Sequence, residues 1–323
     1  MWSTVFSQME QCNEAEVQRL LPLVSSQRRE ESLRFKHLAG QYACLKSYEL
    51  LAQLLTDHYG VPAGTALDFH IGEHGKPVLR NYPNIHFNLS HCPRAIAVIV
   101  DDKPVGIDVE RFIEPKPSLL RYTMNETEVQ EVELSKHPEQ TFAALWTRKE
   151  ALFKYLGTGI RDNLRDILDT PPTDVYLKTS IDESNGFALT LASRRKNIEV
   201  VAAIIHRENS LLATQRGHGT WAGWWEFPGG KLESGESPEE ALHRELREEM
   251  ATEIHIEQLL TTLQYDYPEF HLTMHCFLCT LTEEDYTLVE HTDARWLTIK
   301  DLESVQWLPA DIQLIPLLHN LLS

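Results

Sequence analysis

Cysteine is scarce in this chain, with five among 323 residues, too few for the disulfide framework of a small secreted domain. Long apolar runs are also missing. The stretch at residues 95–100 is among the longest, whereas a membrane-spanning helix needs roughly 20 residues. Residues 1–16 contain no basic segment followed by an apolar one, so the sequence predicts no secretory signal. We therefore expect reduced thiols, a cytoplasmic location and no membrane partner.

Basic residues are outnumbered, because 30 lysines and arginines face 48 aspartates and glutamates, which gives a net charge of −18 at pH 7. Most of the acidic excess lies after residue 195. An acidic chain repels nucleic-acid phosphates, so we expect no nucleic-acid polymer as a partner. Acidic side chains can still serve phosphate chemistry where a divalent cation bridges carboxylate and phosphate oxygens.

The length of the chain predicts about two domains. Helical spacing extends over residues 126–155, and apolar runs elsewhere in the first half are typical of strands. Prolines, a turn sequence and the polar run at residues 193–197 indicate a boundary within residues 170–200. The sequence therefore predicts an α+β protein with domains at residues 1–195 and 196–323.

The most specific pattern in the second half is a glycine-rich loop, residues 229–235, that leads into a predicted helix. Ser237 is suited to cap this helix, with Pro238 at its first position and Glu240 completing a capping box. Three like charges on one helix face are unfavourable unless a cation such as Mg²⁺ or Mn²⁺ neutralises them. The alternative is a solvated acidic face. The three residues are Glu245, Glu248 and Glu249.

This stretch resembles the signature of the Nudix hydrolases, in which glycine, glutamate and an Arg-Glu-apolar-x-Glu-Glu run keep fixed spacings. The matching residues are Gly230, Glu236, Arg244, Glu245, Leu246, Glu248 and Glu249. Ala251 and Thr252 depart from the pattern, which has glycine and then an apolar residue, so we expect an altered helix exit. Residues 224–230 and 308–312 are similar to the MutT subgroup, and the resemblance covers about residues 198–323.

The resemblance implies an α/β/α sandwich that hydrolyses a nucleoside triphosphate to monophosphate and pyrophosphate with Mg²⁺ or Mn²⁺. It implies catalytic roles for Glu245 and Glu248, and a phosphate contact for Arg216. Asp311 stands where the subgroup reads the base with asparagine, so the resemblance implies a base contact there. The implied metal-binding positions are Gly230, Glu245, Glu248, Glu249 and Glu290.

Acidic residues in the first half recur at spacings that place them on common faces. Asp108 and Glu110 are two residues apart on a predicted strand, so both point to one face. Glu150 and Lys154 are four residues apart on a predicted helix and also share a face. Two strand acids and one helix acid would supply the oxygen ligands that Mg²⁺ prefers.

Positive charge for a polyphosphate is available nearby in sequence, from Lys76, His91 and Lys154. Taken singly, these residues have simpler interpretations. Gly75-Lys76-Pro77 is typical of a turn. A single histidine is more often exposed, or hydrogen-bonded within the protein, than a ligand contact. The order in which these segments follow one another, at residues 75–77, 87–91, 106–110 and 146–154, argues against the simpler interpretations.

The ordered set resembles the Sfp-type 4'-phosphopantetheinyl transferases over about residues 15–180. The resemblance implies a pseudo-dimer of two α+β subdomains that moves phosphopantetheine from coenzyme A to a serine of an acyl or peptidyl carrier protein. It implies that Glu150 accepts the serine proton and Lys154 assists the leaving phosphate. Glu31 and Ala43 depart from the pattern, where relatives often have basic residues. The implied ligands are Asp108, Glu110 and Glu150 for Mg²⁺, and Arg28, Lys76, Ser90 and His91 for coenzyme A.

Together, the two resemblances predict a bifunctional enzyme, a phosphopantetheinyl transferase fused to a MutT-like Nudix hydrolase. Two alternatives stay open for the second domain. It could be a nucleotide-binding regulatory module, or a coenzyme A pyrophosphatase that shares a ligand with the transferase.

Overall fold

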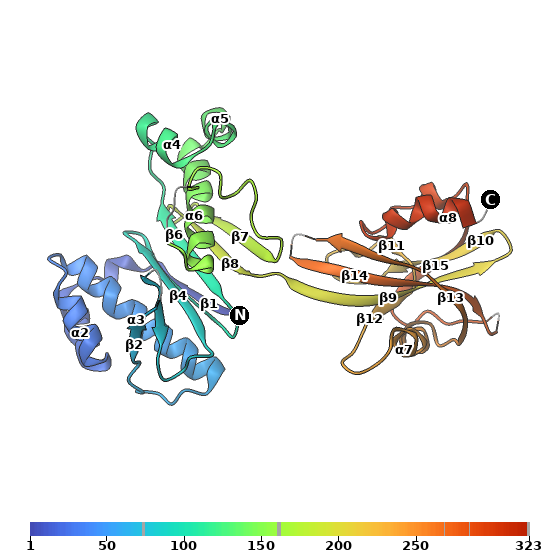
Figure 1. The fold of residues 1–323 in the computed structure, drawn as a ribbon, viewed down its shortest axis with the longest axis horizontal. Helices are drawn as coiled ribbons and strands as arrows, with labels where there is room; N and C mark the ends of the chain where they lie inside the picture. Colours follow the sequence, from blue (N-terminus) through green and yellow to red (C-terminus); the bar gives the residue numbers. More distant parts are fainter. Residues whose placement is uncertain (73–74, 160–162, 268, 284, 322–323) are drawn as a thin grey trace. The chain divides into compact units, whose positions relative to one another are not determined.

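The computed structural model describes residues 1–72, 75–159, 163–267, 269–283 and 285–321. The chain divides into two compact units, residues 1–194 and residues 195–323 (Figure 1). Both units contain helices and sheets, which confirms the predicted α+β class. Within the described ranges, no helix is both long and apolar enough to cross a lipid bilayer.

The first half of unit 1 is an antiparallel sheet packed against one long helix, α3. The strand order is β1-β5-β4, and β5 is buried along almost its whole length because its residues are apolar. Gly60 ends α3 in the left-handed conformation that favours glycine. The elements are β1 (Trp2–Phe6), η1 (Met9–Gln11), α1 (Glu14–Leu20), η2 (Leu21–Leu23), α2 (Ser26–Leu33), α3 (Leu38–Tyr59), β2 (Phe69–Ile71), β3 (Pro77–Leu79), β4 (His86–Cys92) and β5 (Ala95–Asp101).

The second half of unit 1 repeats this plan, with an antiparallel sheet of order β6-β8-β7 and the long helix α6 against it. Gly106 on β6 permits the close approach of α6, because a Cβ there would overlap the carbonyl oxygen of Ala151. β6 also packs against β4 and β5, so the two halves share a border. The elements are β6 (Val105–Arg111), α4 (Pro117–Thr123), α5 (Glu126–Leu134), α6 (Pro138–Leu156), β7 (Val175–Asp182) and β8 (Phe187–Arg194).

Unit 2 is a mixed sheet with α7 on one face and α8 on the other, the predicted α/β/α arrangement (Figure 1). The main strand order is β11-β10-β9-β14-β13, with β9 and β14 parallel. A buried apolar cluster lies on each face of the sheet. The elements are β9 (Lys196–Arg207), β10 (Ser210–Arg216), β11 (Trp225–Glu226), β12 (Gly229–Lys231), α7 (Pro238–Met250), β13 (Ile254–Asp266), β14 (Phe270–Leu281), β15 (His291–Thr298), η4 (Leu302–Ser304), η5 (Asp311–Leu314) and α8 (Ile315–Leu321).

The start and end of α7 show how local sequence sets this helix. Ser237 and Glu240 form the predicted capping box, with Pro238 in the first turn. Ala251 follows the helix in a left-handed conformation, with φ 47°, which alanine adopts only at a cost. The departure from glycine at this position therefore keeps the helix exit and adds backbone strain.

Two local features add detail to what the sequence predicts. The helical pattern at residues 126–155 forms two helices, α5 and α6, separated at residues 135–137, because Pro138 is suited to begin a helix and not to continue one. The polar run at residues 193–197 is not a loop. β8 ends at Arg194 and β9 begins at Lys196, so strand structure continues almost unbroken through it.

Candidate active sites

Asp108 is the centre of the acidic group in unit 1. It lies on β6 and is 3% exposed. Its Oδ1 accepts hydrogen bonds from Ser90 Oγ at 2.8 Å and from Lys154 Nζ at 2.7 Å. Its Oδ2 is buried and has no hydrogen-bond partner among the described residues. A buried carboxylate oxygen without a partner is costly, so this atom fits a ligand that the protein does not itself supply.

Glu110 and Glu150 lie close enough to Asp108 for their charges to interact. Burial raises the pKa of Glu110 to about 7, and the negative charges of Asp108 and Glu150 add to the effect. Burial and then Asp108 also raise the pKa of Glu150, and the Lys154 ammonium opposes both shifts. Three repelling acids in a poorly solvated region favour a bound cation.

The strand and the helix that carry these residues explain their convergence. β6 presents Asp108 and Glu110 on one face, and α6 presents Glu150 and Lys154 on successive turns. Lys154 Nζ also donates to the carbonyl of Ile107 at 3.0 Å, which fastens the helix to the strand. The sequence-predicted group of acids and lysine is therefore brought together.

The predicted coenzyme A residues lie in different surroundings. Arg28 and His91 both line a cavity of about 460 Å³ between α2 and β4. Lys76 is not among the residues that line this cavity. Its Nζ instead donates hydrogen bonds to the main-chain carbonyls of Val105 at 3.1 Å and Lys154 at 2.6 Å. Burial lowers the pKa of Lys76 to about 8.

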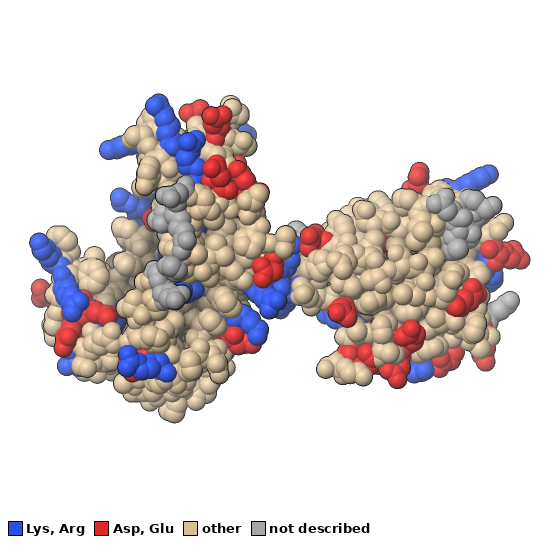
Figure 2. Space-filling model, viewed as in Figure 1, with Lys and Arg blue, Asp and Glu red and all other residues tan. Residues whose placement is uncertain are grey.

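In unit 2, Arg244 organises the acids of α7. Its guanidinium donates to Glu245 at 2.8 Å, to Glu248 at 3.3 Å and to Glu236 at 2.6 Å. The Glu245 carboxylate lies against Gly230, where any Cβ would overlap it. A side chain at residue 230 would therefore displace the Glu245 carboxylate from its position. Glu248 is much more exposed than Glu245, and acidic side chains gather around α7 in Figure 2.

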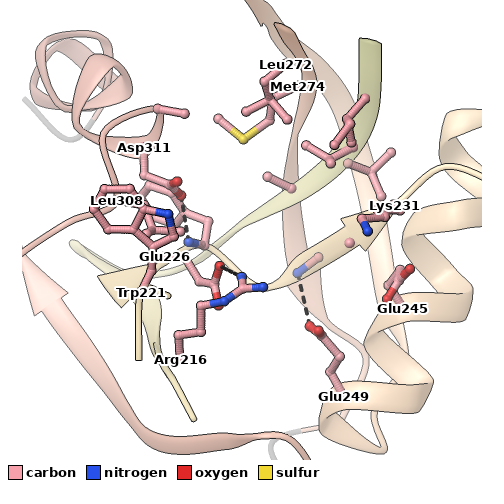
Figure 3. Close-up of a pocket in the computed structure, with 18 of the residues that line it drawn as sticks. Arg216, Trp221, Glu226, Lys231, Glu245, Glu249, Leu272, Met274, Leu308 and Asp311 are labelled. Carbon is pink, nitrogen blue, oxygen red and sulfur yellow. Dashed lines mark hydrogen bonds and ion pairs between the residues drawn. The ribbon is translucent and has the colours of Figure 1, made fainter. Parts of the chain in front are cut away.

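Glu249 points from α7 toward the loop before β12 (Figure 3). Its Oε2 accepts a long hydrogen bond of 3.4 Å from the amide of Gly229. The pKa of Glu249 is raised to about 7, mainly by burial and to a smaller extent by the charges of Glu226 and Glu245, against the opposing charge of His291. Glu249 therefore belongs to an acidic group that a cation would stabilise.

A cavity of about 520 Å³ extends from these glutamates to η5. Its far end is lined by apolar and aromatic side chains, among them Trp221, Phe270 and Met274, together with Asp311 (Figure 3). Asp311 is 5% exposed, and its Oδ1 accepts a hydrogen bond of 2.9 Å from the Phe227 amide. Burial raises the pKa of Asp311 to about 7.

Two other predicted residues of unit 2 also line the cavity. Arg216 donates to Glu226 at 2.7 Å, and Glu290 is exposed at the cavity. Sequence reasoning missed Glu226 and His291. His291 Nε2 lies 3.4 Å from Glu226 Oε1, and its Nδ1 is buried without a hydrogen-bond partner in the described ranges. The motif at residues 224–230 contained Glu226, but no pattern singled out His291.

Both acidic groups have the chemistry of a divalent metal site, although no three His, Cys, Asp or Glu side chains of the described residues converge closely enough to enclose an ion. In unit 1 the donor set is carboxylate oxygen, and one buried oxygen of Asp108 lacks a partner among the residues that the structure describes. In unit 2 the Glu245 carboxylate lies against Gly230, in the space that a side chain at residue 230 would enter. Hard oxygen donors of this kind fit Mg²⁺ or Mn²⁺.

Comparisons with known proteins match each unit separately. The model of the 4'-phosphopantetheinyl transferase superfamily matches residues 104–206, and that of the NUDIX domain matches residues 196–318. A 4'-phosphopantetheinyl transferase of Bacillus subtilis is 34% identical over 149 residues, which is 45% of this chain and 65% of the relative. The chain thus spans slightly less than two thirds of the length of this transferase.

Relatives of the second unit are covered more fully. An 8-oxo-dGTP diphosphatase of Proteus vulgaris is 39% identical, over 29% of this chain and 85% of the relative. A CTP pyrophosphohydrolase of Escherichia coli K12 is 36% identical, over 37% of this chain and 90% of the relative. The chain therefore belongs to the Nudix family through its second unit. The region before this domain is similar to the 4'-phosphopantetheinyl transferase superfamily.

Proposed function

We propose that the chain is a bifunctional enzyme with one active site in each unit. Unit 1 transfers 4'-phosphopantetheine from coenzyme A to a serine of an acyl or peptidyl carrier protein. The observation that carries this proposal is the buried Asp108, whose Oδ1 is held by Ser90 and Lys154 and whose Oδ2 has no hydrogen-bond partner in the described part of the chain. The superfamily match and the similarity to a Bacillus transferase support it.

Asp108, Glu110 and Glu150 are the residues that would hold Mg²⁺, which would neutralise charge on the diphosphate of coenzyme A. Glu150 accepts the proton of the attacking serine, a role suited to a carboxylate whose pKa is raised by burial. Lys154 places its ammonium beside Asp108, where it stabilises charge on the leaving phosphate. Ser90 keeps Asp108 oriented, and Lys76 fastens the segment before β3 to β6 and α6.

Unit 2 hydrolyses nucleoside triphosphates, including modified ones, to monophosphate and pyrophosphate. The observation that carries this proposal is the cavity that joins the α7 glutamates to an apolar end containing one buried acid, Asp311. A charged end for phosphates and an apolar end for a base suit a nucleotide. Similarity to an 8-oxo-dGTP diphosphatase and a CTP pyrophosphohydrolase supports this substrate class.

Glu245, Glu248 and Glu249, with Glu290 and the carbonyl of Gly230, are the groups that would hold Mg²⁺ or Mn²⁺, which would draw charge from the phosphates. Glu245 or Glu248 positions the attacking water and takes its proton. Arg244 holds both carboxylates, and Arg216 contacts phosphate once it leaves Glu226.

Asp311 reads the base in this proposal. Burial keeps its pKa near 7, so the carboxyl can donate a hydrogen bond when protonated and accept one when ionised. Oxidised dGTP is therefore the first expected substrate, and modified cytidine nucleotides are the second.

Two assays on the intact chain test the proposal. With Mg²⁺ and coenzyme A, we expect the mass of an apo carrier protein to increase by one phosphopantetheine group, and chelation of the metal to abolish the change. With a panel of 8-oxo-dGTP, dGTP, 5-methyl-dCTP, dCTP and coenzyme A, we expect pyrophosphate from nucleotides. Nucleotide binding without pyrophosphate release would contradict hydrolysis and favour a regulatory module, and cleavage of coenzyme A alone would favour a coenzyme A pyrophosphatase.

A further inference from the structure

The cavity between α2 and β4 lies near the acidic group of unit 1. Arg28, Glu31, Arg34 and His91 line it. The charges of Lys154 and Asp108 act on the His91 ring, as does that of Arg28. A long substrate whose diphosphate lies at the acids would therefore extend its far end past His91 into this cavity.

Arg28, one of the cations that line the cavity, already forms hydrogen bonds within the protein. Its Nε donates to the carbonyl of Cys44 at 3.2 Å, and its Nη1 donates to Glu31 Oε2 at 3.1 Å. The other oxygen of Glu31 accepts a hydrogen bond from Gln27 Nε2 at 3.2 Å. Both oxygens of Glu31 are thus held, and the carboxylate offsets the charge of Arg28. Figure 2 shows basic and acidic side chains side by side over α2.

The remaining groups supply little more positive charge. Desolvation, followed by the charges of Lys154 and Arg28, lowers the pKa of His91, so its ring is neutral at pH 7 and can only donate or accept hydrogen bonds. Arg34 has no ion-pair or hydrogen-bond partner for its guanidinium among the described residues. The lining therefore carries about one net positive charge, whereas a phosphate monoester carries −1.5 to −2.

We propose that Glu31 is a specificity-determining residue that weakens recognition of the 3'-phosphate of coenzyme A, so that dephospho-coenzyme A serves nearly as well. This proposal rests on the transferase function proposed for unit 1. The reaction balances with either donor: the serine oxygen bonds to phosphorus, the diphosphate bond breaks and the serine proton goes to Glu150. The leaving group is adenosine 3',5'-bisphosphate in one case and AMP in the other.

The test compares kcat/KM for coenzyme A and dephospho-coenzyme A in the intact chain, with one apo carrier protein. We expect the two donors to differ by less than about threefold in the wild type, because attraction by Arg34 is offset at Glu31. Glu31→Gln keeps the side-chain shape and removes the charge, so the preference for coenzyme A should rise about tenfold. Arg34→Gln should lower that preference. Glu30→Gln, an exposed neighbour on the same helix, should leave it unchanged.

A wild-type preference for coenzyme A above a hundredfold, or equal changes for both donors in Glu31→Gln, would overturn the role of Glu31 while leaving the transferase function intact. Calorimetry of adenosine 3',5'-bisphosphate and AMP binding tests the role of Glu31 separately from the transferase function. If the chain uses neither donor, the proposed transferase function is wrong, and the two measured affinities still decide the role of Glu31. A gain of about tenfold for the bisphosphate alone in Glu31→Gln supports it, and equal affinities in both proteins refute it.

Discussion

Replacing Asp311 by asparagine should stabilise unit 2, and more so at high pH. Asp311 is buried, and its nearest charges are Glu226, which raises its pKa, and Arg216, which lowers it. Asparagine keeps an oxygen for the Phe227 amide, which now donates to Oδ1 at 2.9 Å. It removes only the ionisation that burial opposes.

The size of the effect follows from the pKa of about 7, compared with an ordinary value of 3.8. Below pH 3.8 the carboxyl is protonated in both the folded and unfolded states. Between the two values only the unfolded state loses the proton, so each pH unit costs the folded state about 1.4 kcal/mol. The cost is about 2 kcal/mol at pH 5 and levels off at about 4 kcal/mol above pH 7. Stability is thus lost as the pH rises through the folded-state pKa.

Urea unfolding at pH 5 and pH 8, followed by tryptophan fluorescence, measures this difference, because five of the seven tryptophans lie in unit 2. Asp311→Asn should gain about 2 to 3 kcal/mol more, relative to the wild type, at pH 8 than at pH 5. Glu303→Gln, which removes an exposed acid of the same unit, serves as the control. Equal gains at the two pH values would refute the argument from burial.

Three further predictions concern the backbone and the base pocket. Ala251→Gly should stabilise unit 2 by about 1 kcal/mol, since it relieves the positive φ after α7, and calorimetry should show a higher Tm. An unchanged Tm would show that the exit is unstrained. Gly106→Val should reduce carrier-protein modification at least tenfold and leave pyrophosphate release unchanged, because a Cβ there forces β6 away from α6. Normal transfer by this variant would contradict the packing argument. In the nucleotide panel, Asp311→Asn should change the ratio of 8-oxo-dGTP to dCTP hydrolysis, and identical rates on all nucleotides in both proteins would remove the base-reading role.

The features that were predictable from sequence depend on local spacing. The capping box at Ser237 and Glu240 involves residues three apart, and the acids of α7 share a face because of helical periodicity. Asp108 and Glu110 likewise share a face of one strand. Elements with strong local signals therefore appear where the sequence predicts them.

The features that were not predictable depend on pairings between distant segments. Asp311 meets the Phe227 amide across 84 positions, and His291 reaches Glu226 because β15 and β11 both pair with β10. The engagement of Lys76 by two main-chain carbonyls depends on how β6 and α6 pack. The position of the break between α5 and α6, at residues 135–137, does not follow from helical spacing alone.

The central claim, that two independent active sites share one chain, is tested most directly by two variants assayed for both activities. Asp108→Ala should abolish carrier-protein modification and leave pyrophosphate release from 8-oxo-dGTP at the wild-type rate. Glu245→Gln should do the reverse. Near-normal transfer by Asp108→Ala at saturating Mg²⁺, or near-normal hydrolysis by Glu245→Gln, would contradict this account.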